Sequence, residues 1–224
     1  MTDALRNIIL AVTSAAAVLA VASVYLPAAH DSPSLPQPDT KAKATLAQAL
    51  ASRRSIRQFT NAALSVDQIA QLCWSAQGVT DARRGLRTAP SAGATYPLEL
   101  YVATAAGVQR YVPSRHALVG HIEGDIRKPL AAAALGQPWV SAAPAVFVFA
   151  ADVQRTERRY GSRANRYVWM EAGHAAQNLL LQATALGLGS VPVGAFEDDR
   201  VAEAIQLPAS QRPLYILPVG RPAK

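Results

Sequence analysis

Apolar and polar residues follow strand-like patterns in several short runs of the second half of the chain. Residues 98–102 alternate between the two kinds, and residues 108–112 follow after a turn at Gly107, which predicts a β-hairpin. Residues 145–151, AVFVFAA, form an uninterrupted apolar run between Pro144 and Asp152. Such a run is typical of a central strand that is buried on both faces. Shorter strands are expected at 190–193 and 214–219.

Helical spacing of apolar residues marks five further segments. Residues 41–54 are expected to be helical, and Ser65 with Gln68 forms a possible capping box before a helix that ends at Gly78. Asp125 is expected to cap a helix that runs to Leu135, and a short helix is expected at 199–206. The longest segment, 163–186, is apolar on nearly every side in its second half. This helix should therefore be buried in the core or in a subunit interface.

The order of these elements predicts an α+β fold, with a mostly antiparallel central sheet flanked by helices. The hairpin comes first and mixed strands and helices follow, so the regular strand–helix alternation of a doubly wound parallel fold is missing. No internal repeat is visible, and half of the 224 residues are apolar. We therefore expect one folded domain of ordinary size, at residues 41–224.

The first 40 residues differ from this domain in composition. Residues 8–26 carry no charge, which fits either a signal-peptide core or a short membrane anchor, so residues 1–26 are assigned to such a segment. Residues 27–40 contain four prolines and are expected to form an extended linker. The protein is thus expected to be exported or tethered to the membrane, and the N-terminal segment would then contact the membrane. A cytoplasmic location would follow if that segment is not part of the natural product.

The charge of the chain limits its partners. The formal net charge is +7, and residues 41–224 carry 21 basic and 12 acidic residues, a surplus of +9. This surplus suits nucleic acid, an anionic membrane surface or a phosphorylated ligand, and a solvated basic surface is the alternative. The basic clusters at 83–87 and 155–166 come without a helix-turn-helix or finger motif, and aromatic residues are only 6% of the chain. Nucleic acid is therefore not an expected partner.

Several common chemistries are not supported by the residues present. Cys73 is the only cysteine, so the chain has no internal disulfide and no cysteine-built metal site, and we expect Cys73 to be buried in its helix. Glu171 and His174 have the i, i+3 spacing of di-metal helix bundles, but no second copy of this pair exists. We interpret them as a helix pair or an interface hydrogen bond and expect no metal site. The signatures of zinc proteases, α/β-hydrolases and P-loop enzymes are also missing.

Three motifs are candidates for ligand binding. RRSIRQF, residues 53–59, places three arginines and a serine within five positions, which suits a phosphate clamp, although arginines at a helix C-terminus also stabilise the helix dipole. PSAGATYPLELYV, residues 90–102, begins with small residues, as where a ligand approaches the backbone. GLGSVPVGAF, residues 187–196, lacks the G-x-G-x-x-G spacing and follows a helix, so it is not a dinucleotide fingerprint.

Four motifs in order, RRSIRQF, APSAGATYPLELYV, EAGHAAQNLLLQATALGLGSVPVGAF and LPVGRP, resemble the nitroreductase family of FMN-dependent oxidoreductases. The resemblance covers about residues 45–222 and is closest to the branch that includes the azoline (thiazoline and oxazoline) dehydrogenases. It implies a homodimer, with the long helix at the interface and FMN bound between the two chains. It also implies hydride transfer through flavin N5 between NAD(P)H or an organic donor and a small organic acceptor.

The resemblance also implies roles for particular residues. The flavin phosphate would be held by basic and hydroxyl side chains near both ends of the domain, the ring by small residues, and the N5 edge by backbone amides. Gln177 would approach from the partner chain. The implied phosphate ligands are Arg53, Arg54, Ser55, Arg57 and Arg221; the ring would contact Pro90, Ser91, Ala92 and Gly93; and the N5 loop would be Pro192, Val193, Gly194 and Ala195.

The chain departs from the family pattern at three places. Ala94 stands where many members have an asparagine, and Gly194 where many have an acidic residue. The azoline dehydrogenase branch is described with a Lys-Tyr pair for proton transfer, whereas this chain has Arg159-Tyr160. Arginine is a poor base because it does not deprotonate, so Tyr160 is the candidate acid–base residue. The alternatives are an azoline-type dehydrogenase and a non-catalytic flavin-binding protein of the cell envelope.

Overall fold

The computed structural model describes residues 34–41 and 44–223. The proposed signal peptide or anchor and the first part of the linker lie outside these residues. None of the helices in the described part of the chain is both long enough and apolar enough to cross a bilayer.

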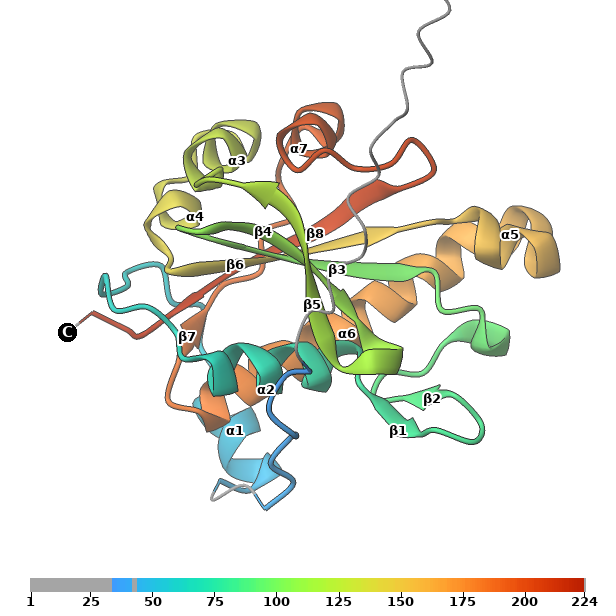
Figure 1. Ribbon diagram of the computed structural model, residues 1–224, viewed down its shortest axis with the longest axis horizontal. Coiled ribbons are helices and arrows are strands. Elements are labelled where there is room, and N and C mark those ends of the chain that lie inside the picture. The colour runs from blue at the N-terminus through green and yellow to red at the C-terminus, as the bar shows by residue number, and fades with distance from the viewer. Residues whose placement is uncertain (1–33, 42–43, 224) are drawn as a thin grey trace, which may run out of the picture. The chain divides into compact units, whose positions relative to one another are not determined.

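A six-stranded sheet organises the domain, with the strand order β5-β4-β3-β6-β8-β7 (Figure 1). Every pair of neighbouring strands in this sheet is antiparallel, which confirms the predicted sheet type. Two further short strands, β1 (Val79–Asp81) and β2 (Leu86–Arg87), form a separate hairpin. The strands of the main sheet are β3 (Leu98–Thr104), β4 (Gly107–Val112), β5 (Ala117–Glu123), β6 (Ala145–Ala151), β7 (Gly189–Ser190) and β8 (Arg212–Gly220).

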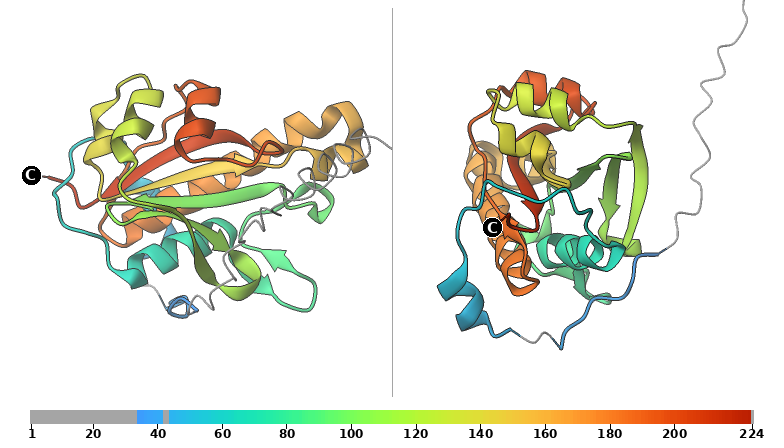
Figure 2. Two further views of the ribbon diagram at one scale, coloured as in Figure 1. Left: turned by 45° about the horizontal axis from the view of Figure 1, so that its top comes forward. Right: turned by 90° about the vertical axis from the view of Figure 1, so that its left-hand side faces the viewer.

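Helices cover both faces of the sheet, so the domain has three layers (Figure 1, Figure 2). One face carries α2 and α6, and the other carries α3, α4 and α7. Short 3-10 turns follow β2, β4 and α5. The α-helices are α1 (Leu46–Ser52), α2 (Val66–Gln77), α3 (Arg127–Ala133), α4 (Pro138–Ala142), α5 (Gln154–Tyr160), α6 (Ala164–Ala185) and α7 (Asp198–Ala204), and the 3-10 turns are η2 (Ala92–Ala94), η3 (Pro113–Arg115) and η4 (Gly161–Arg163).

Strand β6 is the centre of the sheet, as its apolar sequence predicts. All seven of its residues are buried, and it pairs with β3 on one side and β8 on the other. Because side chains alternate along a strand, Phe147 and Phe149 pack into the core under α2 and α6, while Val146 and Val148 pack into the core under α3, α4 and α7. One uninterrupted apolar run thus supplies both cores.

Two helix predictions are confirmed almost to the residue, and two are too long. Ser65 and Gln68 form the capping box of α2, and α6 occupies nearly the whole predicted segment. The first helix covers only Leu46–Ser52, because the Thr45 side chain caps it. The N-cap of α3 is Ile126 and not the predicted Asp125, although Asp125 accepts a hydrogen bond from the Arg127 amide. This helix also ends before Leu135, whose φ of 56° is left-handed.

The strand predicted at 190–193 is shorter than expected. Strand β7 ends at Ser190, since Pro192 has no amide proton to donate to a ladder. Val193 rejoins the sheet by a single bridge to Ile216. The chain after β7 therefore runs along the free edge of β8 instead of forming a regular strand.

The described part of the predicted linker, residues 34–40, packs against the domain. The Leu35 amide donates to the His116 carbonyl at 2.8 Å, and the Leu35 side chain is buried in the core beneath α2. Farther along, the Asp39 amide donates to Oε1 of Gln71 at 2.8 Å. The packed part of the chain thus begins by residue 34 instead of residue 41, because a single buried leucine anchors a segment whose prolines suggest an unattached linker.

Candidate functional site

Three of the sequence motifs meet at the β7 edge of the sheet. The amide of Ile56 donates to the Ser190 carbonyl at 2.9 Å, and Ser55 forms a parallel bridge with Ser190. The amide of Thr60 donates to the carbonyl of Arg221 at 2.9 Å. The arginine segment, the chain after α6 and the C-terminal segment are therefore neighbours, although they are far apart in sequence.

None of the four arginines in these segments has an acidic partner among the described residues, and only one of them has a hydrogen-bonded side chain there. Within the part of the chain that the structure describes, Arg53, Arg57 and Arg221 make no ion pair. The Arg57 guanidinium lies 5.3 Å from the centre of the Trp139 ring, which orients it without neutralising it. Arg54 differs, because its Nη1 donates to the carbonyls at the C-terminal end of α1. Free guanidinium groups of this kind are suited to bind phosphate oxygens.

The backbone at Gly194 and Ala195 is open to a ligand. Val193 donates to the Ile216 carbonyl at 2.8 Å, but no residue of the described ranges accepts a hydrogen bond from the amide of Gly194 or Ala195. A Cβ atom at Gly194 would have only the Tyr215 ring nearby, at 3.8 Å. The Gln137 side chain donates to the Ala195 carbonyl at 2.8 Å and holds the loop in place. Two unused donors on exposed backbone fit the polar edge of a planar ligand.

The small-residue loop Pro90–Gly93 lies against α5. The Ser91 hydroxyl accepts a hydrogen bond from the Tyr96 amide at 2.9 Å, and Arg159 donates to the Gly93 carbonyl at 3.2 Å. A Cβ atom at Gly93 would lie 2.6 Å from the Tyr160 hydroxyl oxygen, so Tyr160 is in direct contact with this loop. The structure thus brings the candidate acid–base residue next to the predicted ring-binding loop.

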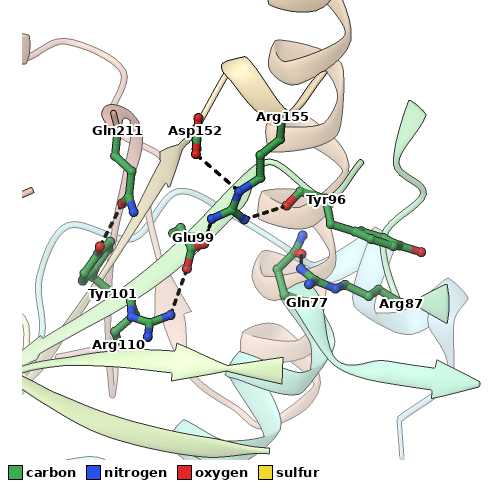
Figure 3. Close-up of polar contacts among 9 residues, drawn as sticks. All are labelled: Gln77, Arg87, Tyr96, Glu99, Tyr101, Arg110, Asp152, Arg155 and Gln211. Carbon is green, nitrogen blue, oxygen red and sulfur yellow. Dashed lines mark hydrogen bonds and ion pairs between the residues drawn. The ribbon is translucent and has the colours of Figure 1, made fainter. Parts of the chain in front are cut away.

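A partly exposed ion-pair network attaches the end of this loop to the sheet (Figure 3). Arg155 donates to Oε1 of Glu99 at 2.7 Å and to the Tyr96 carbonyl at 3.2 Å, and its Nε lies 3.4 Å from Asp152. Arg110 donates to the other oxygen of Glu99 at 3.2 Å. One forked guanidinium therefore joins the loop, β3 and the end of β6.

A shallow pocket of about 240 Å³ lies between this loop and α6, and a buried carboxyl faces it. Glu171 is only 3% exposed, and its Oε1 has no hydrogen-bond partner among the described residues. Burial raises the pKa of Glu171 to about 7, although a hydrogen bond from Ser91 and the charge of Arg87 act in the opposite direction. The pocket is lined by Pro90, Ser91, Ala92, Tyr167, Met170, Glu171 and His174.

The sequence analysis did not identify Glu171 as a site residue. Glu171 and His174 line the same pocket, but no hydrogen bond joins them, so the interpretation as a helix pair is not supported. The available signal was a single carboxylate on the inner, otherwise apolar face of the long helix. No group of three metal-ligating side chains gathers around one point in residues 34–41 and 44–223.

The two parts of the candidate site lie at opposite ends of α6 (Figure 1). The Pro90–Gly93 loop contacts the N-terminal part of this helix, near Glu171, while the arginine segment pairs with Ser190, shortly after the helix ends. At 1.5 Å per residue, the 15 residues from Glu171 to Leu186 span roughly 22 Å. No hydrogen bond among the described residues connects the loop with the arginine segment.

Helix α6 is buried on one side only. Trp169 and Met170 are about half exposed, and Gly173 and Gln177 are exposed on the same helix. The apolar composition of this helix led us to expect burial in the core or in a subunit interface. The inner side confirms the core, and the exposed aromatic and methionine side chains remain available for a partner.

Residue 94 has a backbone conformation that alanine does not favour. Its φ is 54°, and its side chain is exposed, so replacing Ala94 with glycine removes strain without removing a buried contact. We expect Ala94→Gly to raise the free energy of unfolding by roughly 0.5–1 kcal/mol, after the higher entropy of unfolded glycine is subtracted. Urea denaturation measures this. Ala105→Gly, at an exposed turn residue without positive φ, is the control and should not stabilise the protein.

Comparison with known proteins agrees with this architecture. The sequence profile of the Nitroreductase family matches residues 50–221. A Methanocaldococcus jannaschii protein, provisionally described as a nitroreductase, is 44% identical over 182 residues, which cover 79% of this chain and 90% of the relative. A Ralstonia eutropha structure with the same provisional description is 32% identical, with a TM-score of 0.78 over 85% of this chain and 89% of that chain.

A more distant relative carries a name that states its activity. The Bacillus subtilis protein named FMN reductase (NADPH) is 27% identical over 190 residues, and the match covers 79% of this chain but only 65% of that protein. The profile match and the M. jannaschii relative cover most of the folded domain, and all four motifs lie within or at the border of the matched residues. The chain therefore belongs to the nitroreductase family of FMN-dependent oxidoreductases.

Proposed function

We propose that this protein binds FMN at the β7 edge and passes hydride through the flavin from NAD(P)H, or from an organic donor, to a small organic acceptor. The observation that carries this proposal is that the backbone segments holding Arg53, Arg57 and Arg221 pair with each other and with β7, just before the loop of Gly194 and Ala195. None of these arginines has an acidic partner among the described residues, and the amides of Gly194 and Ala195 are unused there. Phosphate and the polar edge of a flavin are the groups that such donors fit.

Each group in the chain has a separate task in this proposal. The arginines and Ser55 bind the phosphate, and the Gly194 and Ala195 amides donate to the N5 edge. The small residues of the Pro90–Gly93 loop allow a flat ring to approach the backbone. The flavin supplies the hydride-accepting and hydride-donating chemistry. Tyr160, in contact with Gly93, is placed to hold or give a proton at its hydroxyl group.

We further propose that two copies of the chain complete each site. The loop and the arginine segment lie at opposite ends of α6, so the loop that reaches the ring would come from the partner chain. The exposed side of α6 supplies an apolar surface for this partner with Trp169 and Met170, and Gln177 on the same side would approach the flavin bound by the partner chain. The family resemblance favours the same arrangement.

The azoline-type dehydrogenase is the second candidate reaction. It is favoured by the position of Arg159-Tyr160, since both residues contact the Pro90–Gly93 loop. Oxidation of an azoline ring needs removal of a proton as well as hydride, and arginine does not act as a base. Tyr160 alone would then have to accept the proton.

The test uses purified flavin-free protein. Added FMN should bind with loss of its fluorescence, and light scattering should report a species of two chains. Anaerobic addition of NADH, NADPH or an azoline substrate, each separately, should bleach the bound flavin with at least one donor. Failure to bind FMN would contradict the proposal, whereas binding without reduction by any donor would favour the non-catalytic envelope protein.

We also propose that the protein acts at the cell envelope, because residues 8–26 form an uncharged apolar segment. Fractionation of cells, followed by sequencing of the N-terminus of the mature protein, distinguishes a cleaved segment from an anchor. Recovery of the intact chain from the cytosolic fraction would contradict this proposal.

A further inference from the structure

The Glu171 carboxyl is buried with little to support its charge among the described residues. Its side chain is 3% exposed, its Oε1 has no hydrogen-bond partner among the described residues, and it faces a pocket. A buried polar atom without a partner is costly, and native proteins keep few of them. This combination of cavity, burial and a free oxygen is typical of a group with a functional task.

The neighbours of Glu171 do not neutralise it. Arg87 comes from β2, but its guanidinium donates to Gln77 at 2.7 Å and lies 4.3 Å from the centre of the Tyr96 ring, and it makes no ion pair within the described residues (Figure 3). From α6, Tyr167 and His174 line the pocket. From the loop, the Ser91 hydroxyl faces the carboxyl, and α5 contributes Tyr160, whose ring packs edge-on to Tyr167 at 5.0 Å. The small exposed fraction of this side chain, 3%, is all that solvent can still reach.

The pocket mouth is bordered by the loop that the proposed function places against the flavin. Pro90, Ser91 and Ala92 form one wall, and the exposed Met170 and His174 form the other. A flat aromatic ring laid along the loop would displace water from this mouth. The side chain would then lose its remaining contact with solvent, and this further desolvation favours the neutral form of the carboxyl.

We propose that Glu171 is a proton-exchanging group of the flavin site, and that flavin binding drives its carboxylate to take up one proton from solvent. This inference rests on the proposed function. The step is a protonation only: the carboxylate and a solvent proton become a carboxylic acid, and no electrons move. In the neutral form, the acid O–H can donate a hydrogen bond inside the closed pocket, which the carboxylate cannot do.

The proposed protonation determines how the affinity for flavin changes with pH. The pKa of Glu171 in the flavin-free protein is about 7, so above that pH flavin binding must bring in a proton. The affinity for flavin therefore falls as pH rises, by up to about tenfold per pH unit between the pKa of the free and of the bound state. A phosphate bound by arginines would change the affinity in the opposite direction. Arginines favour the phosphate dianion, so binding tightens as pH rises and the second phosphate proton, whose pKa is about 6, is lost.

Isothermal titration calorimetry of the flavin-free protein tests the inference directly. The binding heat is measured at pH 8 in HEPES and in Tris, two phosphate-free buffers with different ionisation enthalpies, and the difference counts the protons taken up. We expect uptake of up to about 0.9 proton per flavin, since a group with a pKa near 7 is about nine-tenths ionised at pH 8. Riboflavin, which has no phosphate, should give nearly the same number as FMN.

Substitutions at Glu171 and at a neighbouring residue identify the group that takes up the proton. Glu171→Gln should reduce the uptake to below about 0.2 proton, whereas His174→Asn, at a titratable neighbour in the same pocket, should leave it unchanged. Binding heats that do not depend on the buffer in the wild-type protein would overturn the inference while leaving FMN binding intact. Uptake that persists in Glu171→Gln would also overturn it. Absence of any flavin binding would contradict the proposed function, and the inference with it.

Discussion

Replacing Arg57 and Arg221 together with alanine is expected to weaken FMN binding about a hundredfold. Both residues belong to backbone segments at the β7 edge, and neither has an acidic partner in the described ranges. A hydrogen bond to a charged group contributes about 1.5–3 kcal/mol. A loss of about 3 kcal/mol for the pair corresponds to about a hundredfold in the dissociation constant. Quenching of flavin fluorescence measures this constant.

Two controls separate a phosphate contact from a general effect of charge. Riboflavin lacks the phosphate, so its affinity should change by less than about threefold in the same variant. Arg115→Ala with Lys128→Ala removes the same net charge from exposed positions on η3 and α3 and should leave FMN binding unchanged. Equal weakening of FMN and riboflavin would contradict the assignment of these arginines to the phosphate.

Glu171→Gln is expected to make the flavin-free protein more stable at alkaline pH but not at acid pH. The pKa of this carboxyl rises from 4.5 to about 7 on folding. Because the folded value is higher, its contribution to stability is complete below about pH 4.5 and is lost as pH rises through 7, a total of about 3 kcal/mol at most. Glutamine has the same shape and does not titrate, so it removes this loss.

Urea denaturation at pH 5 and pH 8.5 measures the effect. The difference in unfolding free energy between Glu171→Gln and wild type should increase by roughly 2–3 kcal/mol between these two pH values. The exposed Glu157→Gln variant on α5 is the matched control and should show no such increase. A Glu171→Gln effect of equal size at both pH values would show that packing, not ionisation, explains it.

Much of the fold follows from local patterns. The capping box at Ser65 and Gln68, the unbroken apolar run of β6 and the length of α6 are all readable because each depends on residues close in sequence. One error occurs where distant contacts decide, since Leu35 belongs to the core although prolines surround it. The other is local: β7 stops at Ser190 because of Pro192, which the apolar pattern of the segment obscures.

The candidate site could be predicted only in part, because contacts between residues distant in sequence assemble it. Arginine-rich and glycine-rich segments are visible as motifs, and their order carries the family resemblance. That Ser55 pairs with Ser190, and that Thr60 bonds to Arg221, follows only from the folded chain. The environment of Glu171 was hidden, since its burial comes from a loop some 80 residues away in sequence, at Pro90–Ala92.

The sequence by itself determined the fold class, the family and the residue types available for a flavin, because hydrophobic periodicity and short motifs are local properties. Only the tertiary structure decided which of those residues share a surface. It brought the segments of three arginines without acidic partners in the described ranges to the β7 edge, which leads into the open amides of Gly194 and Ala195, and it put the Pro90–Gly93 loop at the other end of α6. The tertiary structure also raises the pKa of Glu171 to about 7, because desolvation depends on everything packed around a side chain. In the sequence, this residue is only one carboxylate on a helix.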